Sequence, residues 1–165
     1  MRIGVLSDTH DNVSNLIFAL ETLRERGIDT VVHCGDLTDF DLFSHFSDFR
    51  LIYLIGNMDV SPGTVQQRVN RISPDNFAGL VFTGKLDGVW VAATHSHLEG
   101  QVMSLVRERR YQWLFHGHTH RRRDETIRGT RVVNPGALGG SARSSHSFCM
   151  VDLGAGDLEF IRVPS

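Results

Sequence analysis

Runs of hydrophobic residues recur along the first third of the chain, separated by more polar segments. Each run is a short stretch centred on apolar residues, which is typical of strands that are buried in a sheet. Each run is also too short for an ordinary helix. We therefore predict three buried strands, at residues 2–7, 29–35 and 51–56.

Between the first two strands, hydrophobic residues recur at helical spacing from Val13 to Leu23. Asn12 can cap the start of this helix, and Gly27 can end it. A second, shorter helix is predicted at 40–47. Strands and helices that alternate through short connections predict right-handed crossovers and a parallel sheet.

The rest of the chain is richer in hairpins. Residues 80–97 read as two strands that turn at Asp87-Gly88, a residue pair favoured in hairpin turns. The later elements are predicted as a helix at 98–110, a buried strand at 111–115, and hairpins within 125–133 and 147–163. The fold class is therefore α/β, with a parallel first half. Two sheets packed face to face, with helices outside, would accommodate both halves.

The composition is that of an ordinary globular protein. With 165 residues, the chain is long enough for one compact domain, which we assign to residues 1–165. A net charge of −2 does not favour binding to nucleic acid or to a membrane surface, and no segment has the length and hydrophobicity of a membrane span. Cys34 and Cys149 are far apart in sequence, and we interpret them as reduced thiols of a cytoplasmic protein.

Each of five predicted strands is followed, at its C-terminal end, by side chains that can bind a metal ion. In open α/β sheets, ligands bind at this edge. The residues, strand by strand, are Asp8 and His10; Asp36; Asn57 and Asp59; His95 and His97; and His118 and His120.

The pairs Asp8 with His10, His95 with His97, and His118 with His120 each lie at positions i and i+2. In an extended chain such residues point the same way, so each pair can face one cleft. Any single site could be purely structural, and "GHTH" alone supports a structural role and a metal role equally. All five sites together would gather imidazoles and carboxylates at a large cost in desolvation and repulsion, unless a cation lies between them.

The order of these motifs resembles the calcineurin-like metallophosphoesterase superfamily. The matching residues are D-x-H at 8–10, GD at 35–36, GN-x-D at 56–59, His95, and GHTH at 117–120. The resemblance covers residues 3–140, and the short length and "NPGALGGSAR" at 134–143 are similar to its small cap-less phosphodiesterase branch. It implies a four-layer αββα sandwich, in which two mixed β-sheets are flanked by helices.

The resemblance also implies a dinuclear metal site. The ligands would be Asp8, His10 and His120 for one ion, Asn57, His95 and His118 for the other, and Asp36 as the bridge. Mixed nitrogen and oxygen ligands without thiolates suit transition metals, so we expect Mn²⁺, with Ni²⁺, Fe²⁺, Zn²⁺ or Co²⁺ as alternatives. Two ions about 3.5–4 Å apart can generate a bridging hydroxide for in-line attack on phosphorus. The implied activity is hydrolysis of a small phosphodiester.

Two positions depart from the pattern of many relatives. Met58 follows "GN" where relatives often carry a histidine that can protonate the leaving group, and a thioether cannot transfer a proton. Ser96 stands in "HSH" where relatives often read "HGH". We therefore place His97 beside Asp36 and Asn57 among the candidate catalytic residues, as a proton donor or substrate contact. The alternative for His97 is a solvated loop histidine.

Other polar residues receive structural interpretations. Asn12 could contact a phosphate, but capping explains it more simply. Arg121, Arg122 and Arg123 could attract anionic substrates, although a solvated strand face is the simpler interpretation. The remaining histidines are treated as core or surface residues: His33, His45, His116 and His146.

Two other functions compete with a phosphodiesterase. A phosphomonoesterase would need the same ligands. The retromer complex contains a subunit of this fold with a degraded metal site, so a protein-binding scaffold is the second alternative. All seven expected ligand types are present in this chain, which favours the enzyme. Homo-oligomerisation is left open by the sequence.

Overall fold

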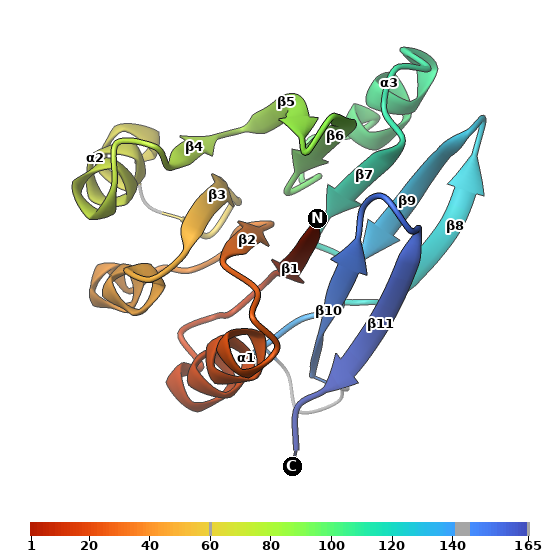
Figure 1. The fold of residues 1–165 in the computed structure, drawn as a ribbon. Helices are drawn as coiled ribbons and strands as arrows, with labels where there is room; N and C mark the ends of the chain where they lie inside the picture. Colours follow the sequence, from red (N-terminus) through yellow and green to blue (C-terminus); the bar gives the residue numbers. More distant parts are fainter. Residues whose placement is uncertain (60, 141–145, 165) are drawn as a thin grey trace.

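The computed structural model describes residues 1–59, 61–140 and 146–164. Two β-sheets form its centre, and the helices lie on their outer sides (Figure 1). The order of elements along the chain is β1, α1, β2, η1, β3, α2, β4, β5, β6, α3, β7, β8, β9, β10 and β11, where η1 is a 3-10 helix.

The larger sheet has six strands in the order β11-β10-β1-β2-β3-β4. Neighbours from β1 to β4 run parallel, whereas β10 pairs antiparallel with β1, and β11 pairs antiparallel with β10. This sheet is therefore mixed. Its strands are β1 (Arg2–Leu6), β2 (Thr30–His33), β3 (Arg50–Leu54), β4 (Phe77–Gly79), β10 (Ser147–Asp152) and β11 (Asp157–Arg162).

The smaller sheet has five strands in the order β5-β6-β7-β9-β8. Its three central strands, β6, β7 and β9, are parallel, and the two edge strands, β5 and β8, pair antiparallel with their neighbours. The sequence had suggested that parallel pairing is confined to the first half of the chain. The smaller sheet shows that it also occurs in the second half. The strands are β5 (Val81–Leu86), β6 (Val89–Thr94), β7 (Trp113–His116), β8 (Arg123–Ile127) and β9 (Thr130–Asn134).

The hydrophobic core is divided into three layers. One cluster lies between the larger sheet and its helices, one between the two sheets, and one between the smaller sheet and its helix. Strand β1 shows how the alternation of side chains builds them. Ile3 and Val5 face the other sheet, whereas Leu6 faces the helical layer, and Gly4 leaves room for Leu23 of α1. This layering confirms the predicted αββα sandwich.

The helices are α1 (Val13–Glu25), η1 (Phe40–Phe46), α2 (Pro62–Ile72) and α3 (Gln101–Arg107). Helix α2 was not predicted from the sequence, because it is largely polar and only Val65 and Val69 of it are buried. The three-residue strand β4 was not predicted either. The helix predicted at 98–110 is shorter, because a left-handed Gly100 precedes its first turn. No helix of the described ranges has the length and hydrophobicity to cross a membrane.

The two sheets are connected through a very short link. Strand β4 is an edge strand of the larger sheet and ends at Gly79, whereas β5 is an edge strand of the smaller sheet and begins at Val81. Leu80 alone joins them. The chain therefore passes directly from one sheet to the other along this side of the sandwich (Figure 1).

Candidate metal centre

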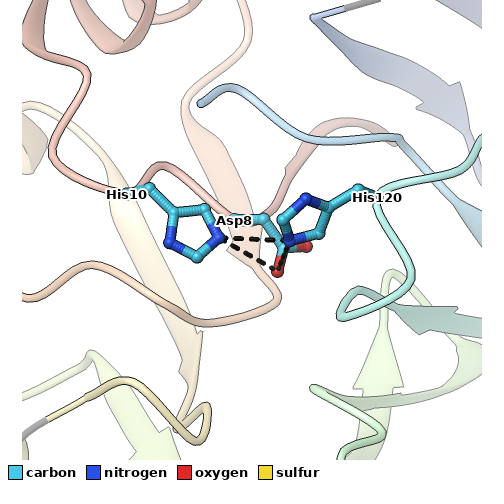
Figure 2. Close-up of side chains that lie close together, drawn as sticks. All are labelled: Asp8, His10 and His120. Carbon is cyan, nitrogen blue, oxygen red and sulfur yellow. Dashed lines mark hydrogen bonds and ion pairs between the residues drawn. The ribbon is translucent and has the colours of Figure 1, made fainter. Parts of the chain in front are cut away.

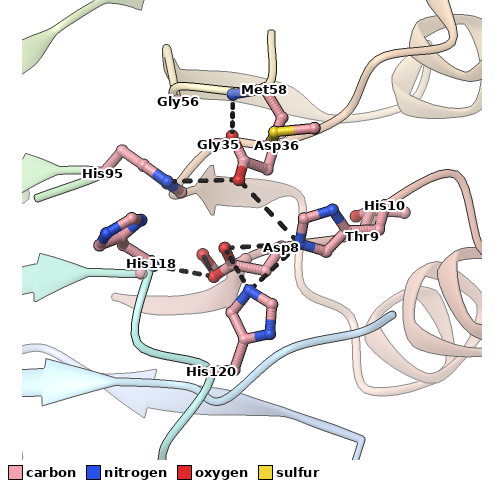
Figure 3. A network of polar contacts seen from close by, with 12 residues as sticks. Asp8, Thr9, His10, Gly35, Asp36, Gly56, Met58, His95, His118 and His120 are labelled. Atoms are coloured by element: carbon pink, nitrogen blue, oxygen red, sulfur yellow. Dashed lines mark hydrogen bonds and ion pairs between the residues drawn. The ribbon is translucent and has the colours of Figure 1, made fainter. Parts of the chain in front are cut away.

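Loops that follow β1, β2, β3, β6 and β7 meet at one end of the sandwich (Figure 3). Three of them belong to the larger sheet and two to the smaller sheet. Strands β1, β2 and β3 are parallel to one another, as are β6 and β7, so their C-terminal ends share an edge within each sheet. The candidate ligands of both sheets are thereby brought to one place.

A first cluster contains Asp8, His10 and His120 (Figure 2). Oδ1 of Asp8 lies 3.2 Å from Nε2 of His120 and 4.0 Å from Nε2 of His10. The two histidine nitrogens are 3.1 Å apart. The other carboxylate oxygen of Asp8 accepts hydrogen bonds from the Ser7 hydroxyl at 2.5 Å and from the backbone N–H of His118 at 3.0 Å. The carboxylate is thus held with Oδ1 directed at the two imidazoles.

A second cluster gathers around His95, which is fully buried. Its Nδ1 donates to the carbonyl of Cys34 at 2.5 Å, so in the neutral ring Nε2 carries the lone pair. That nitrogen lies 3.1 Å from Oδ1 of Asn57 and 3.4 Å from Oδ2 of Asp36. Three atoms with lone pairs therefore converge here, which is the arrangement that a cation needs.

Asp36 lies between the two clusters (Figure 3). Its Oδ1 accepts a hydrogen bond from the backbone N–H of Met58 at 2.9 Å. Its Oδ2 is left to face His95 at 3.4 Å and His10 at 4.0 Å, and these histidines belong to different clusters. This orientation is the one that a bridging carboxylate would need.

The remaining predicted residues lie beside the second cluster. The ring of His118 is 5.1 Å from that of His95, centroid to centroid. The ring of His97 is 5.5 Å from His95 and 6.5 Å from His118. Within the described part of the chain, the buried Nδ1 of His97 has no hydrogen-bond partner. His118 and His120 therefore diverge, one toward each cluster, whereas the sequence analysis expected them to point the same way.

The prediction of extended chain is wrong for Asp8 with His10 and for His118 with His120, because these residues have left-handed backbone. Positive φ angles are found at Asp8 (53°), His10 (43°), Asp36 (62°), His118 (68°) and His120 (57°). Left-handed backbone is unfavourable for residues with a Cβ, at a cost of about 1–3 kcal/mol each, and persists only where the surroundings enforce it. Tight left-handed turns, rather than strand alternation, direct these side chains.

Burial and the charges of neighbouring carboxylates and imidazoles shift the pKa values of several residues of the site. Burial works to raise the pKa of Asp36, but its hydrogen bond with His95 and the nearby imidazoles hold this pKa below the usual value. Burial likewise works to lower the pKa of His95, yet Asp36 and Asp8 raise it. The neighbouring carboxylate of Asp8 raises the pKa of His120. Burial, followed by the charges of His95 and His118, lowers the pKa of His97.

Two glycines allow the loops to approach one another. A Cβ at Gly56 would collide with Oδ1 of Asp36, and a Cβ at Gly117 would collide with the hydroxyl of Ser7. The glycines of the "GN" and "GHTH" motifs are thus needed for close approach of backbone to the site.

Two further polar residues that support these loops, one buried and one exposed, received no role from the sequence. Asn134 is fully buried, and its amide donates to the carbonyl of Gly117 at 2.8 Å and to the hydroxyl of Thr119 at 3.2 Å. Asp11 accepts from the backbone N–H groups of Thr38 and Asp39 at 2.9 and 2.8 Å, which joins the first loop to the second. Only proximity in the fold reveals these partners, which are distant in sequence.

A further buried group lies behind Asp36. The ring of His33 stacks on that of Tyr53, with 5.1 Å between centroids, and contacts the Thr9 hydroxyl at 2.7 Å. Tyr53 in turn donates to the carboxylate of Asp59 at 2.8 Å. In the sequence, Asp59 was grouped with the strand-end residues but was not among the implied ligands, and His33 was treated as a core or surface histidine.

The structure also shows where the remaining residues discussed from the sequence lie. Asn12 caps α1, since its side chain accepts from the backbone N–H of Asn15 at 3.1 Å. Met58 is 54 % exposed. Arg121 and Arg122 are exposed, whereas Arg123 begins β8 and is half-buried. Both cysteines are buried and free. The motif at 134–143 is described only as far as 140, and its last three residues lie outside the described residues.

The residues present fit a metal site by one further observation. Oδ1 of Asp8 is buried, and among the described residues it has no hydrogen-bond donor. A buried carboxylate oxygen without a donor is costly, and a cation would satisfy it. The same carboxylate belongs to both groups of side chains that could hold an ion, Asp8 with His10 and His120, and Asp8 with Asp36 and His95.

Comparisons with known proteins agree with this geometry. Residues 1–156 match the family model of the calcineurin-like phosphoesterase superfamily domain. A phosphodiesterase of Methanocaldococcus jannaschii is 28% identical over 138 residues, which cover 82% of this chain and 83% of that protein. The structure of an archaeal phosphodiesterase superposes with a TM-score of 0.93 at 25% identity, covering 99% of this chain and 100% of the other. Vps29 of Chaetomium thermophilum shares the fold, with a TM-score of 0.71 at 16% identity over 98% and 96% of the two chains.

Proposed function

This chain belongs to the calcineurin-like phosphoesterase superfamily, and from that premise we propose that it is a phosphodiesterase that uses two divalent transition-metal ions. The observation that carries the proposal is the position of Asp36, whose Oδ2 faces a histidine of each cluster. The archaeal relative named as a phosphodiesterase supports a diester as the substrate.

We assign the ligands as the clusters suggest. Asp8, His10 and His120 would hold one ion, and Asn57, His95 and His118 would hold the other, with Asp36 shared between them. When bound, such a pair of ions supplies positive charge that acidifies a water molecule and stabilises the attacking and leaving oxygens at phosphorus. Mn²⁺ is the ion that we expect, with Ni²⁺, Fe²⁺, Zn²⁺ and Co²⁺ as alternatives.

The side chains around the ligands would divide the remaining tasks. Asn57 can contribute a neutral oxygen ligand, so the charge of the centre is set by the two carboxylates. Among the described residues the buried Nδ1 of His97 has no hydrogen-bond partner, and a lowered pKa keeps the ring neutral at neutral pH, so we propose that this imidazole contacts substrate or accepts a proton. Met58 is exposed beside Asp36 and cannot donate a proton, so leaving groups that depart as anions should react fastest.

A scaffold function is less well supported than an enzyme. The shared fold of Vps29 does not distinguish the two functions, because this fold is common to both. The complete set of seven candidate ligands supports the enzyme, because a scaffold has no need for so many converging metal-binding side chains. A phosphomonoesterase is the nearer alternative. The single domain over 1–165, the cytoplasmic location and a homo-oligomeric state stay predictions.

The test is an assay of the purified chain after reconstitution with Mn²⁺. We expect bis(p-nitrophenyl) phosphate to be hydrolysed faster than p-nitrophenyl phosphate, with about two ions bound per chain by elemental analysis. Asp48→Asn removes an exposed carboxylate remote from the site and should leave both values unchanged. Faster hydrolysis of the monoester would favour the phosphomonoesterase, and two bound ions without hydrolysis of either ester would favour the scaffold.

A further inference from the structure

We propose that Tyr53 and Asp59 are positioning residues, which together hold the Asp36 loop against the Asn57 loop and thereby set the spacing of the two cation sites. The inference rests on the proposed function, because it concerns the same metal centre. Neither residue is among the proposed ligands.

The carboxylate of Asp59 connects two loops that are distant in sequence. It accepts hydrogen bonds from the backbone N–H of Gly56 at 2.7 Å, in its own loop, and from the backbone N–H of Leu37 at 2.9 Å, in the loop after β2. A longer contact reaches the N–H of Asp36 at 3.4 Å. One side chain therefore fixes the backbone on either side of both Asp36 and Asn57.

The orientation of Asp36 depends on the loop that Asp59 closes. Oδ1 of Asp36 accepts from the N–H of Met58, which lies between Asn57 and Asp59 in the chain. If this loop moved, Oδ1 would lose its donor, and Oδ2 would lose the direction in which it faces His10 and His95. The bridging geometry is thus a property of the two loops together.

Tyr53 anchors this connection in the core. Its side chain is fully buried, and its hydroxyl donates to Asp59 at 2.8 Å while it accepts from the N–H of Leu37 at 3.0 Å. The ring stacks on His33 and meets Phe43 edge-on at 4.9 Å, so it has no room to swing away. The polar contacts of Tyr53 and Asp59 are with each other and with the backbone of the two ligand loops. This pattern is typical of outer groups that orient metal ligands.

Tyr53→Phe is the sharpest variant, because it removes the hydroxyl and keeps the stacked ring. Tyr111→Phe is the matched control: Tyr111 is 4 % exposed and donates to Glu108 at 2.6 Å, in the core layer between the smaller sheet and α3. Both variants lose one hydroxyl from a buried ring. They should therefore unfold at similar temperatures in the presence of chelator.

The readout is Mn²⁺ binding by calorimetry, together with the EPR spectrum of the loaded protein. We expect Tyr53→Phe to weaken binding of at least one ion by about 10–100-fold and to alter the coupled two-ion signal, with Tyr111→Phe unchanged. Asp59→Asn should lower affinity further, and Asp59→Glu should restore part of it. The inference is overturned if Tyr53→Phe binds two ions with the wild-type affinity and spectrum.

The same data separate this inference from the proposed function. Wild-type protein that binds two ions without hydrolysing diesters would overturn the phosphodiesterase, and the binding comparison would still decide the role of Tyr53. Wild-type protein that binds no Mn²⁺ would overturn both. Should Asp59→Asn fail to fold, Tyr53→Phe alone carries the comparison.

Discussion

Left-handed backbone occurs at both the hairpin turns and the ligand loops of this protein, for different reasons. The turns β5–β6 and β8–β9 place Asp87-Gly88 and Arg128-Gly129 at positive φ. Two-residue hairpins require this conformation, and a short pair such as Asp-Gly adopts it readily. The conformation of each turn is therefore determined by its own residues, and a substitution there should affect only the turn.

At the other region, five candidate ligands adopt the same conformation without any hairpin that requires it. Asp8 and Asp36 are buried, His10 and His120 are partly buried and His118 is exposed, and hydrogen bonds with Ser7, Asn134 and Asp59 hold their loops. The strain is thus offset by buried contacts rather than by turn chemistry. A left-handed residue is therefore informative about function when contacts with other parts of the structure, rather than the turn that contains it, hold its backbone in that conformation.

The largest effect should come from removing the shared carboxylate. Asp36→Asn keeps the size of the side chain and the oxygen that faces Met58, but it removes the negative charge between the clusters. We expect turnover of bis(p-nitrophenyl) phosphate to fall by roughly 10³-fold at saturating Mn²⁺, since metal-centred charge stabilisation is worth several kcal/mol. Asp87→Asn, at the hairpin turn, should keep wild-type turnover. Equal turnover of Asp36→Asn and Asp87→Asn would show that the left-handed ligand loops matter no more for activity than the hairpin turns do.

Protonation of the core behind the ligand loops should have the next largest effect. Burial lowers the pKa of His33 to about 4 from 6.5. The N–H of Gly35 donates to its Nδ1 at 3.2 Å, so Nε2 carries the proton toward Thr9. Because the unfolded chain accepts a proton below pH 6.5 and the folded chain only near pH 4, stability is lost as pH falls through this window, by up to ~3 kcal/mol. Urea unfolding at several pH values, in chelator, measures it. His33→Gln should lack this component, and identical pH dependence in both proteins would refute the assignment.

Removal of metal should act on the ligand loops alone. Ligand at 100 times its dissociation constant stabilises a protein by about 2.7 kcal/mol, which for a chain of this size corresponds to roughly 5–10 °C in Tm. We expect EDTA to lower the Tm of the Mn²⁺-loaded protein by at least that amount. The shift should shrink in Asp36→Asn and persist in Arg128→Asn. An unchanged Tm in EDTA would count against metal binding altogether.

The smallest effect should come from the hairpin turn between β8 and β9. Arg128 adopts φ 53° ahead of Gly129, a position at which Asn is preferred. Arg128→Asn should therefore stabilise the protein by about 0.5–1 kcal/mol in urea unfolding, without any change in activity. Arg50→Asn, in an extended strand, serves as the control and should give no such gain. A destabilised Arg128→Asn would show that turn chemistry does not govern this region.

The sequence predicted the elements whose structure is specified by residues close together in the chain. The apolar runs located most strands, Asn12 marked the start of α1, and Asp87-Gly88 marked a hairpin. The polar residues at strand ends indicated the edge at which the candidate ligands gather. What sequence could not supply depends on distant contacts. A left-handed turn at His118 has no local signature, and the partnership of Tyr53 with Leu37 exists only once β2 and β3 are paired.

The single-residue link at Leu80 has a mechanical consequence. Along that edge a covalent connection prevents the two sheets from sliding past each other, whereas β8 and β11, at the opposite edges, are joined by no such link. The carboxylates Asp8 and Asp36 come from one sheet, and His95 and His120 come from the other. Ions bound by these residues would form a further connection between the two sheets, at the end of the sandwich. A shearing force would then be resisted by the ions as well as by Leu80 and the core between the sheets, and chelation would remove the contribution of the ions.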